Sequence, residues 1–298
     1  MLAEACFDPF DSPDYLFEIK WDGTRCCAFR DQGGLALRNR RHVELGHRYP
    51  ELHCLEALPN GTLVDGEIVV LADGKPSFPK LMQREHLIDP EKIQRMSERL
   101  PATLMLFDLI YQDGEDLHRR PLAERRERLE ALIEPLDSPH VLVPSYVLER
   151  GCDYFAGVRD LGLEGIMAKK LSSPYRKGRR SEDWLKIKVS QIGNFALIGY
   201  TQRDGEDTIS ALVLGLPGPK GWIYKGKVGT GFTEHQRAEF FAALRQLPPL
   251  KQIPPDGPKE AHWHDTGLVA KIRYFEVMES GALRGPVFEG LTDEDPTG

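Results

Sequence analysis

A lysine flanked by two carboxylates is the first arrangement in the sequence that could do chemistry. Glu18, Lys20 and Asp22 alternate with apolar residues over 15–21, a pattern typical of a half-buried strand that Asp22-Gly23 would end. A lysine becomes a nucleophile when its pKa falls from about 10.4. It can equally belong to a surface salt-bridge ladder that contributes little energy. The local pattern alone leaves both interpretations open.

Length and composition limit the kinds of protein to consider. The 298 residues, 41% apolar and 29% charged, suffice for two globular domains with a sizeable core. No apolar run approaches the roughly 20 residues that span a bilayer, and the N-terminus lacks a signal-peptide pattern. Five scattered cysteines without a CxxC pair indicate neither a disulfide framework nor a zinc site. We therefore expect a cytoplasmic protein without a membrane partner.

The charge is unevenly distributed. The chain has 39 Lys and Arg against 46 Asp and Glu, a net charge of −7, whereas a protein that simply coats nucleic acid should be basic. Residues 169–188, however, hold eight basic and two acidic residues. Because local potential governs the approach of a polyanion, a polyanionic partner is permitted.

Periodicity predicts strands and helices on both sides of a domain boundary. Gly33-Gly34 suits a hairpin turn. The apolar run 104–111 predicts a strand buried on both faces, and residues 79–100 predict a polar helical segment. An amphipathic helix is expected after Pro121 and another at about 152–161. From residue 194, short strands and one helix with a Thr233/Gln236 capping box are typical of a small Greek-key barrel.

Five separated segments carry charged residues at matching spacing, and this set resembles the ATP-dependent DNA ligases of the covalent nucleotidyltransferase superfamily. Residues 18–25 match the E-x-K-x-D-G-x-R nucleophile motif at each defining position. The later motifs follow in the family's order as Arg38-Asn39, Asp65-Gly66-Glu67, Phe107-Asp108, Leu163-Glu164-Gly165 and Trp184-Leu185-Lys186-Ile187-Lys188. Residues 227–232 and 283–291 are most similar to the ligase domain of bacterial end-joining ligases.

The resemblance implies an α+β fold in two domains. Residues 1–191 would form a nucleotidyltransferase (ATP-grasp-like) adenylation domain with antiparallel sheets and flanking helices. Residues 192–298 would form an OB-fold β-barrel. The same resemblance implies DNA repair or end joining in a bacterial, nucleoid-associated setting, and we expect a monomer.

The resemblance also implies roles for individual residues. Lys20 would attack ATP to form a Lys20–AMP intermediate, with Lys186 and Lys188 stabilising charge on the transferred phosphoryl group and Asp22 orienting the loop and Arg25. ATP would contact Glu18, Arg25, Arg38, Glu67, Phe107, Arg180 and Lys186. Glu67 and Glu164 would hold Mg²⁺ or Mn²⁺. Without the family, Phe107 would be interpreted as a core residue.

Partners follow from the same resemblance. Nicked or broken double-stranded DNA would be the substrate, contacted through Lys169, Lys170, Arg176, Lys177 and Arg179, which could otherwise belong to a solvated loop. A Ku-type end-binding protein and a repair polymerase are implied by family association alone.

The final motif departs from the family pattern. An R-x-D-K arrangement there orients the leaving pyrophosphate, whereas this chain has Thr292 and Asp295 at the two basic positions. Acidic groups repel pyrophosphate, so we expect weak self-adenylation, a cation supplied from elsewhere (Arg284 is nearest in sequence), or action mainly from a pre-adenylated form.

Two other functions stay open. An RNA ligase or a capping-type nucleotidyltransferase would share the Lys20 chemistry. A weakly catalytic module that only binds DNA ends belongs to a different class, and the altered final motif favours it while Lys20, Glu67, Glu164, Lys186 and Lys188 count against it.

Overall fold

The computed structural model describes all residues except 204, 220, 279 and 298. Contacts divide the chain into two compact units, Met1–Val189 and Ser190–Gly298, each with its own hydrophobic core. Within the described residues, no helix combines the length and the apolar character needed to cross a membrane.

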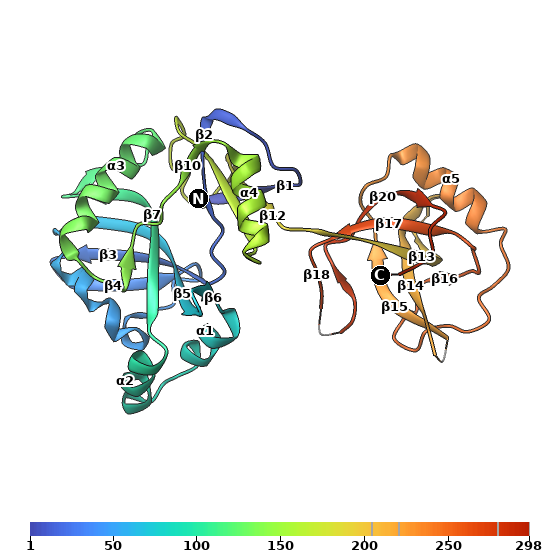
Figure 1. Ribbon diagram of the computed structural model, residues 1–298, viewed down its shortest axis with the longest axis horizontal. Helices are drawn as coiled ribbons and strands as arrows, with labels where there is room; N and C mark the ends of the chain where they lie inside the picture. The colour runs from blue at the N-terminus through green and yellow to red at the C-terminus, as the bar shows by residue number, and fades with distance from the viewer. Residues whose placement is uncertain (204, 220, 279, 298) are drawn as a thin grey trace. The chain divides into compact units, whose positions relative to one another are not determined.

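A seven-stranded sheet forms the larger part of unit 1 (Figure 1). Its antiparallel path is β4 (Gly34–Asn39), β3 (Thr24–Asp31), β5 (Thr62–Ala72), β7 (Ala102–Gln112) and β8 (Glu115–Asp116), with β6 (Lys75–Pro76) on β5 and β9 (Val141–Leu142) parallel to β7. The Gly33-Gly34 hairpin is confirmed, with Gly34 at φ +110°. Leu104, Leu106 and Leu109 of β7 are fully buried, which confirms the strand predicted at 104–111.

A second sheet of five strands carries the lysine segment. Its order is β1 (Leu2–Cys6), β12 (Arg180–Lys188), β11 (Gly165–Lys170), β2 (Ser12–Ile19) and β10 (Val147–Glu149), antiparallel except for β1 against β12. The expected half-buried strand over 15–21 is wrong in two respects. The strand ends at Ile19, and Leu16, Phe17 and Glu18 are buried in succession because the hydrophobic core covers one face of β2 and an ion-paired cluster the other.

Helices cover the outer faces of these sheets. The α-helices of unit 1 are α1 (Phe78–Glu85), α2 (Pro90–Arg99), α3 (Leu122–Ile133) and α4 (Gly151–Asp160), and the 3₁₀ helices are Gly46–Arg48, Pro50–Ala57 and Glu134–Leu136. The single helical segment predicted at 79–100 is therefore two helices. The expected apolar stripe of α3 is confirmed by Leu122, Leu129 and Ile133, but two arginines of this helix are buried as well.

Unit 2 is an antiparallel sheet with one helix, consistent with an OB-fold. Its strand order is β15 (Gly221–Val228), β14 (Ile209–Gly218), β13 (Gln191–Gln202), β17 (Val269–Tyr274) and β20 (Val287–Thr292), with β16 (His262–Trp263) on β13 and a β18 (Glu276–Val277)–β19 (Leu283–Arg284) hairpin. Helix α5 (Glu234–Leu244) packs on β13 and β14. Its capping box between Thr233 and Gln236 is confirmed.

Candidate active site

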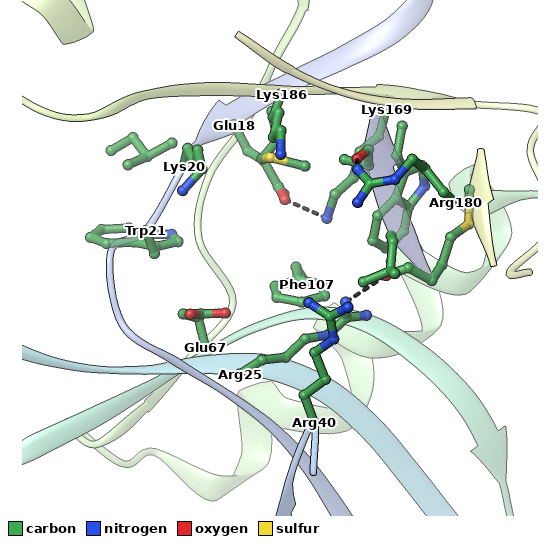
Figure 2. A pocket seen from close by; sticks show the side chains of 16 residues that line it. Glu18, Lys20, Trp21, Arg25, Arg40, Glu67, Phe107, Lys169, Arg180 and Lys186 are labelled. Atoms are coloured by element: carbon green, nitrogen blue, oxygen red, sulfur yellow. Dashed lines mark hydrogen bonds and ion pairs between the residues drawn. The ribbon is translucent and has the colours of Figure 1, made fainter. Parts of the chain in front are cut away.

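A pocket of about 280 Å³ in unit 1 is lined by both sheets. Figure 2 shows Glu18, Lys20 and Lys186 entering it from the five-stranded sheet, and Arg25, Glu67 and Phe107 from the seven-stranded sheet. Chain segments as far apart as Met1 and Lys186 thus contribute residues to one cavity.

The amine of Lys20 lies at one end of this pocket, directly after β2. It forms an ion pair with Glu164, whose other carboxylate oxygen lies 2.5 Å from Lys188 Nζ. Burial opposes the charge on Glu164, but the two lysines outweigh it and lower its pKa. Burial and the nearby cations Arg180, Lys188 and Lys20 lower the pKa of Lys186. Positive charge is therefore concentrated around Lys20, in a position to meet phosphate oxygens.

The carboxyl of Glu67 lies across the pocket from Lys20 (Figure 2). Burial raises the pKa of Glu67 to about 8, and the attraction of Arg25 and Lys20 offsets this only in part. Its neighbour on the same face of β5, Asp65, is fully buried and accepts from Arg25 Nε at 3.0 Å and Nη2 at 2.5 Å. Despite that burial, Arg25 keeps the pKa of Asp65 below its usual value. Two carboxyls on one strand therefore have opposite pKa shifts.

A second part of the pocket is built around Glu18, which is only 2% exposed. Its carboxylate pairs with Lys169 Nζ at 2.5 Å and with Arg126 Nη1 at 3.1 Å. The ammonium of Lys169 also lies 4.1 Å from the ring centroid of Phe107 and 4.2 Å from that of Trp184. This part of the pocket offers a fixed anionic acceptor beside an aromatic ring, the chemistry that suits a base with an exocyclic amino group.

The expectation that Lys169 contacts DNA is therefore wrong, because its side chain is buried beneath the pocket and paired with Glu18. The other four residues of that set are placed differently. Arg176, Lys177 and Arg179 are exposed on the loop between β11 and β12, and Lys170 is half-buried at the end of β11. Arg176 pairs with Asp183 at 2.9 Å and Lys177 with Asp116 at 3.5 Å, both at the surface.

Four further predicted residues are not among those that line this pocket: Asp22, Arg38, Glu164 and Lys188. Glu164 and Lys188 adjoin it through the ion pair of Glu164 with Lys20. Arg38 is exposed and lines a second groove of about 750 Å³, whereas Arg40, two residues on, lines the pocket itself. Asp22 is exposed in the turn after Trp21 and is not among the lining residues. The second groove also receives Phe29, His42 and Tyr175, and it shares Arg25 and Arg40 with the pocket.

Sequence reasoning missed four residues of this site. Trp21 and Arg40 line it, and both lie within or beside segments that had been singled out, so proximity to Lys20 and Arg38 was an available signal. Lys169 was singled out, but for another role. Arg126 had no signal, because a charged residue in an amphipathic helix is expected to face solvent.

Comparison with known proteins gives a consistent result. Residues 1–188 match the model of the ATP dependent DNA ligase domain, and residues 205–295 that of the ATP dependent DNA ligase C terminal region. The multifunctional non-homologous end joining protein LigD of Mycolicibacterium smegmatis is 33% identical over 98% of this chain, which spans 38% of that protein. The SPbeta prophage-derived DNA ligase-like protein LigB of Bacillus subtilis is 34% identical over 97% of both chains.

Solved structures agree with these relatives. The crystal structure of the ligase domain of Mycobacterium tuberculosis LigD is 30% identical with a TM-score of 0.56, covering 99% of this chain and 96% of that one. A mycobacterial DNA ligase D complexed with ATP has the same identity, TM-score and coverage. On the extent of both family matches, this chain belongs to the ATP-dependent DNA ligase family.

Proposed function

We propose that this protein seals breaks between a 5′-phosphate and a 3′-hydroxyl in DNA through a Lys20–AMP intermediate. The observation that supports this most strongly is a single pocket lined by Lys20, Lys186, Glu18 and Phe107. Glu164 and Lys188 adjoin this pocket, because Glu164 forms ion pairs with both Lys20 and Lys188. A nucleotide bound with its base at Glu18 would direct its phosphates to Lys20.

The reaction follows from these positions. The neutral amine of Lys20 attacks the α-phosphorus of ATP, so that a P–N bond forms while the bond to pyrophosphate breaks. The 5′-phosphate of the DNA then takes the AMP from Lys20, and the 3′-hydroxyl displaces AMP to form the phosphodiester. Neighbouring cations favour loss of the proton from Lys20 and stabilise charge that develops on phosphoryl oxygens, the role we assign to Lys186 and Lys188.

ATP recognition would divide between the two ends of the pocket. The ring of Phe107 would stack on adenine, and the carboxylate of Glu18 would accept from its amino group. Arg25 and Arg180 line the pocket near the expected sugar and phosphates. Arg40 takes the place in the pocket that the sequence suggested for Arg38.

The carboxyls fit a divalent cation held jointly with ATP. Among the described residues, no three or more His, Cys, Asp or Glu side chains are grouped so that they could hold a metal ion by themselves. Mg²⁺, however, commonly binds one or two carboxylates together with phosphate oxygens and water. Glu67 suits this role because it is half-buried in the wall of the pocket and has a raised pKa, which a nearby cation would lower. Glu67 and Glu164 would thus hold Mg²⁺ or Mn²⁺, which neutralises charge on the phosphates when bound.

The second groove supports DNA as the acceptor. It adjoins the pocket through Arg25 and Arg40, and Arg38 and His42 place further cationic or protonatable groups beside the exposed ring of Phe29. Cationic groups beside apolar surface suit a phosphodiester backbone and its sugars. Lys170, Arg176, Lys177 and Arg179 would extend the contact. The same face could take RNA, which we keep as the alternative substrate.

The biological setting is a further proposal. LigD relatives are named for non-homologous end joining, and we propose that this chain acts in such repair, with a Ku-type protein and a repair polymerase as partners, in the bacterial cytoplasm near the nucleoid. We also propose that 1–191 and 192–298 act as separate domains of a monomer.

Incubation with α-labelled ATP and Mg²⁺, followed by denaturing electrophoresis, tests this proposal. Wild-type protein should carry covalent label, Lys20→Ala none, and the control Lys92→Ala, on the exposed face of α2, the wild-type amount. Label that persists in Lys20→Ala would contradict the assignment. Labelling with GTP and transfer to RNA ends would instead favour a capping-type or RNA-joining enzyme.

A further inference from the structure

The loop between β11 and β12, residues 171–179, is attached to unit 1 through two ion pairs, one of them fully buried and the other partly exposed. In the first, Arg125 donates to both oxygens of Asp108, at 2.7 and 2.9 Å, and also to the carbonyl oxygen of Ser173 at 2.9 Å. Arg125 and Asp108 are fully buried, and Asp108 directly follows Phe107 in β7. The start of the loop is thus fixed to the strand that supplies the proposed adenine platform.

The second attachment is made by the hydroxyl of Tyr175. It donates to Asp65 Oδ2 at 2.6 Å and accepts from Arg25 Nη2 at 3.2 Å. The same guanidinium donates to Asp65 at 3.0 and 2.5 Å, so the three side chains form a closed network. Tyr175 is 7% exposed, and its ring packs edge-on against Trp184 with centroids 5.9 Å apart.

This network lies where the two cavities meet. Arg25 lines both the pocket and the second groove, and Tyr175 and Gly178 of the loop line the groove. Exposed Arg176, Lys177 and Arg179 follow Tyr175 by one to four residues. The Tyr175 hydroxyl therefore joins the arginine of the pocket to the segment that carries the basic side chains. Met1 makes a second link, because its carbonyl oxygen accepts from Arg25 Nη1 and its sulfur accepts from the Arg176 N–H at 3.3 Å.

We infer that the Tyr175 hydroxyl is a positioning group that fixes Arg25 for ATP and couples the basic loop to the pocket. The inference rests on the proposed function for the identity of ATP and DNA. Without the hydroxyl, Asp65 loses one of its hydrogen-bond donors and Arg25 loses one of its acceptors. The guanidinium of Arg25 therefore gains conformational freedom that ATP binding must remove. ATP affinity should therefore depend on Tyr175, although this side chain does not line the pocket.

The test compares Tyr175→Phe with Tyr111→Phe. Tyr111 is a matched control, because its hydroxyl also bonds an aspartate, Asp116 at 2.8 Å, and contacts the same loop through Lys177 at 2.9 Å, but not Arg25. Single-turnover formation of Lys20–AMP is measured against ATP concentration. In Tyr175→Phe the apparent KM for ATP should rise about fivefold with the maximal rate changed less than about twofold, and in Tyr111→Phe neither should change.

A double-mutant cycle separates positioning from general loosening of the fold. The double variant Arg25→Lys/Tyr175→Phe should have a KM for ATP less than about twofold above that of Arg25→Lys alone, because the effect of Tyr175 passes through the guanidinium of Arg25. An unchanged KM in folded Tyr175→Phe, or the full fivefold effect in the Arg25→Lys background, would overturn the inference. Failure of the wild type to form any adduct would instead contradict the proposed function.

A measurement on the wild type avoids dependence on the folding of a variant. The affinity for nicked DNA is measured with and without a non-cleavable ATP analogue, and the affinity for the analogue with and without DNA. Coupling through the loop predicts the same factor above one in both directions. No dependence of either affinity on the other ligand would remove the inferred coupling.

Discussion

The two ends of the pocket handle charge in different ways. Around Glu18, the paired side chains of Glu18, Arg126 and Lys169 are 1–3% exposed. Around Lys20, the paired side chains of Lys20, Glu164 and Lys188 are 20–24% exposed. A buried network loses much when one partner is removed, whereas partly solvated charges can exchange partners at low cost. The part of the pocket around Glu18, which we call the base end, is therefore suited to holding a base in one orientation. The part around Lys20, which we call the phosphate end, is suited to groups that must change partners during the reaction.

Removing Arg126 should have the largest effect, a loss of stability caused by disruption of the ion pairs around Glu18. Arg126→Met leaves the carboxylate of Glu18 paired with Lys169 alone. It also removes the hydrogen-bond donor of the carbonyl groups of Phe107 and Pro144. We expect a loss of about 3–5 kcal/mol in the free energy of unfolding, measured by urea titration. The control is Arg128→Met, which removes a partly solvated arginine of the same helix and should change the free energy of unfolding little. Equal stability of both variants would contradict the contrast between the ends.

Removing Lys188 should affect the rate more than stability. Lys188→Ala takes one of two cations from Glu164 and reduces positive potential beside Lys20. We expect Lys20–AMP formation to slow by about 10²-fold at saturating ATP, with a change below about 1 kcal/mol in stability, because the group is partly solvated. Rapid-quench labelling and urea titration measure the two quantities. A large loss of stability, with adduct formation at the wild-type rate in the protein that remains folded, would contradict this prediction.

The raised pKa of Glu67 predicts that its contribution to the free energy of unfolding falls as the pH rises, whereas that of an ordinary paired carboxylate grows. Its folded pKa of about 8 exceeds the unfolded value of 4.5, so the folded state holds the proton more tightly. Its contribution to stability is complete below about pH 4.5 and is lost as pH rises toward 8. Because the pocket is open to solvent, we expect a loss of about 1–2 kcal/mol over that range. In Glu67→Gln, unfolding free energies should lack this decline; an identical decline would contradict it.

Placing cations at the two altered positions of the final motif should give the smallest effect, a modest rise in the rate of Lys20–AMP formation. Thr292 ends β20, and Asp295 follows it where the resembled family carries arginine and lysine. Thr292→Arg combined with Asp295→Lys should speed Lys20–AMP formation a few-fold, because pyrophosphate leaves toward positive charge. The matched control is Thr297→Arg. An unchanged rate of adduct formation would show that these positions do not limit self-adenylation.

The phosphate end could be predicted from sequence better than the base end. Lys20, Lys186 and Glu164 lie on short motifs whose order and spacing are visible, and strand periodicity placed Lys186 and Lys188 on one face. Arg126 could not be found, because its burial depends on the packing of α3 against β7. Lys169 was misassigned because it begins a stretch rich in basic residues, several of them exposed, while its partner Glu18 is 151 positions away. Long-range ion pairs leave no local pattern.

The most direct measurement follows AMP from Lys20 to DNA. Protein labelled with α-labelled ATP is freed of nucleotide and chased, without ATP, with a nicked duplex carrying a 5′-phosphate. The account predicts that label leaves the protein, passes through AMP-linked DNA and ends as free AMP, with one sealed nick per labelled Lys20. Label that stays on the protein, or passes equally well to RNA ends, would contradict DNA joining as the function of this pocket.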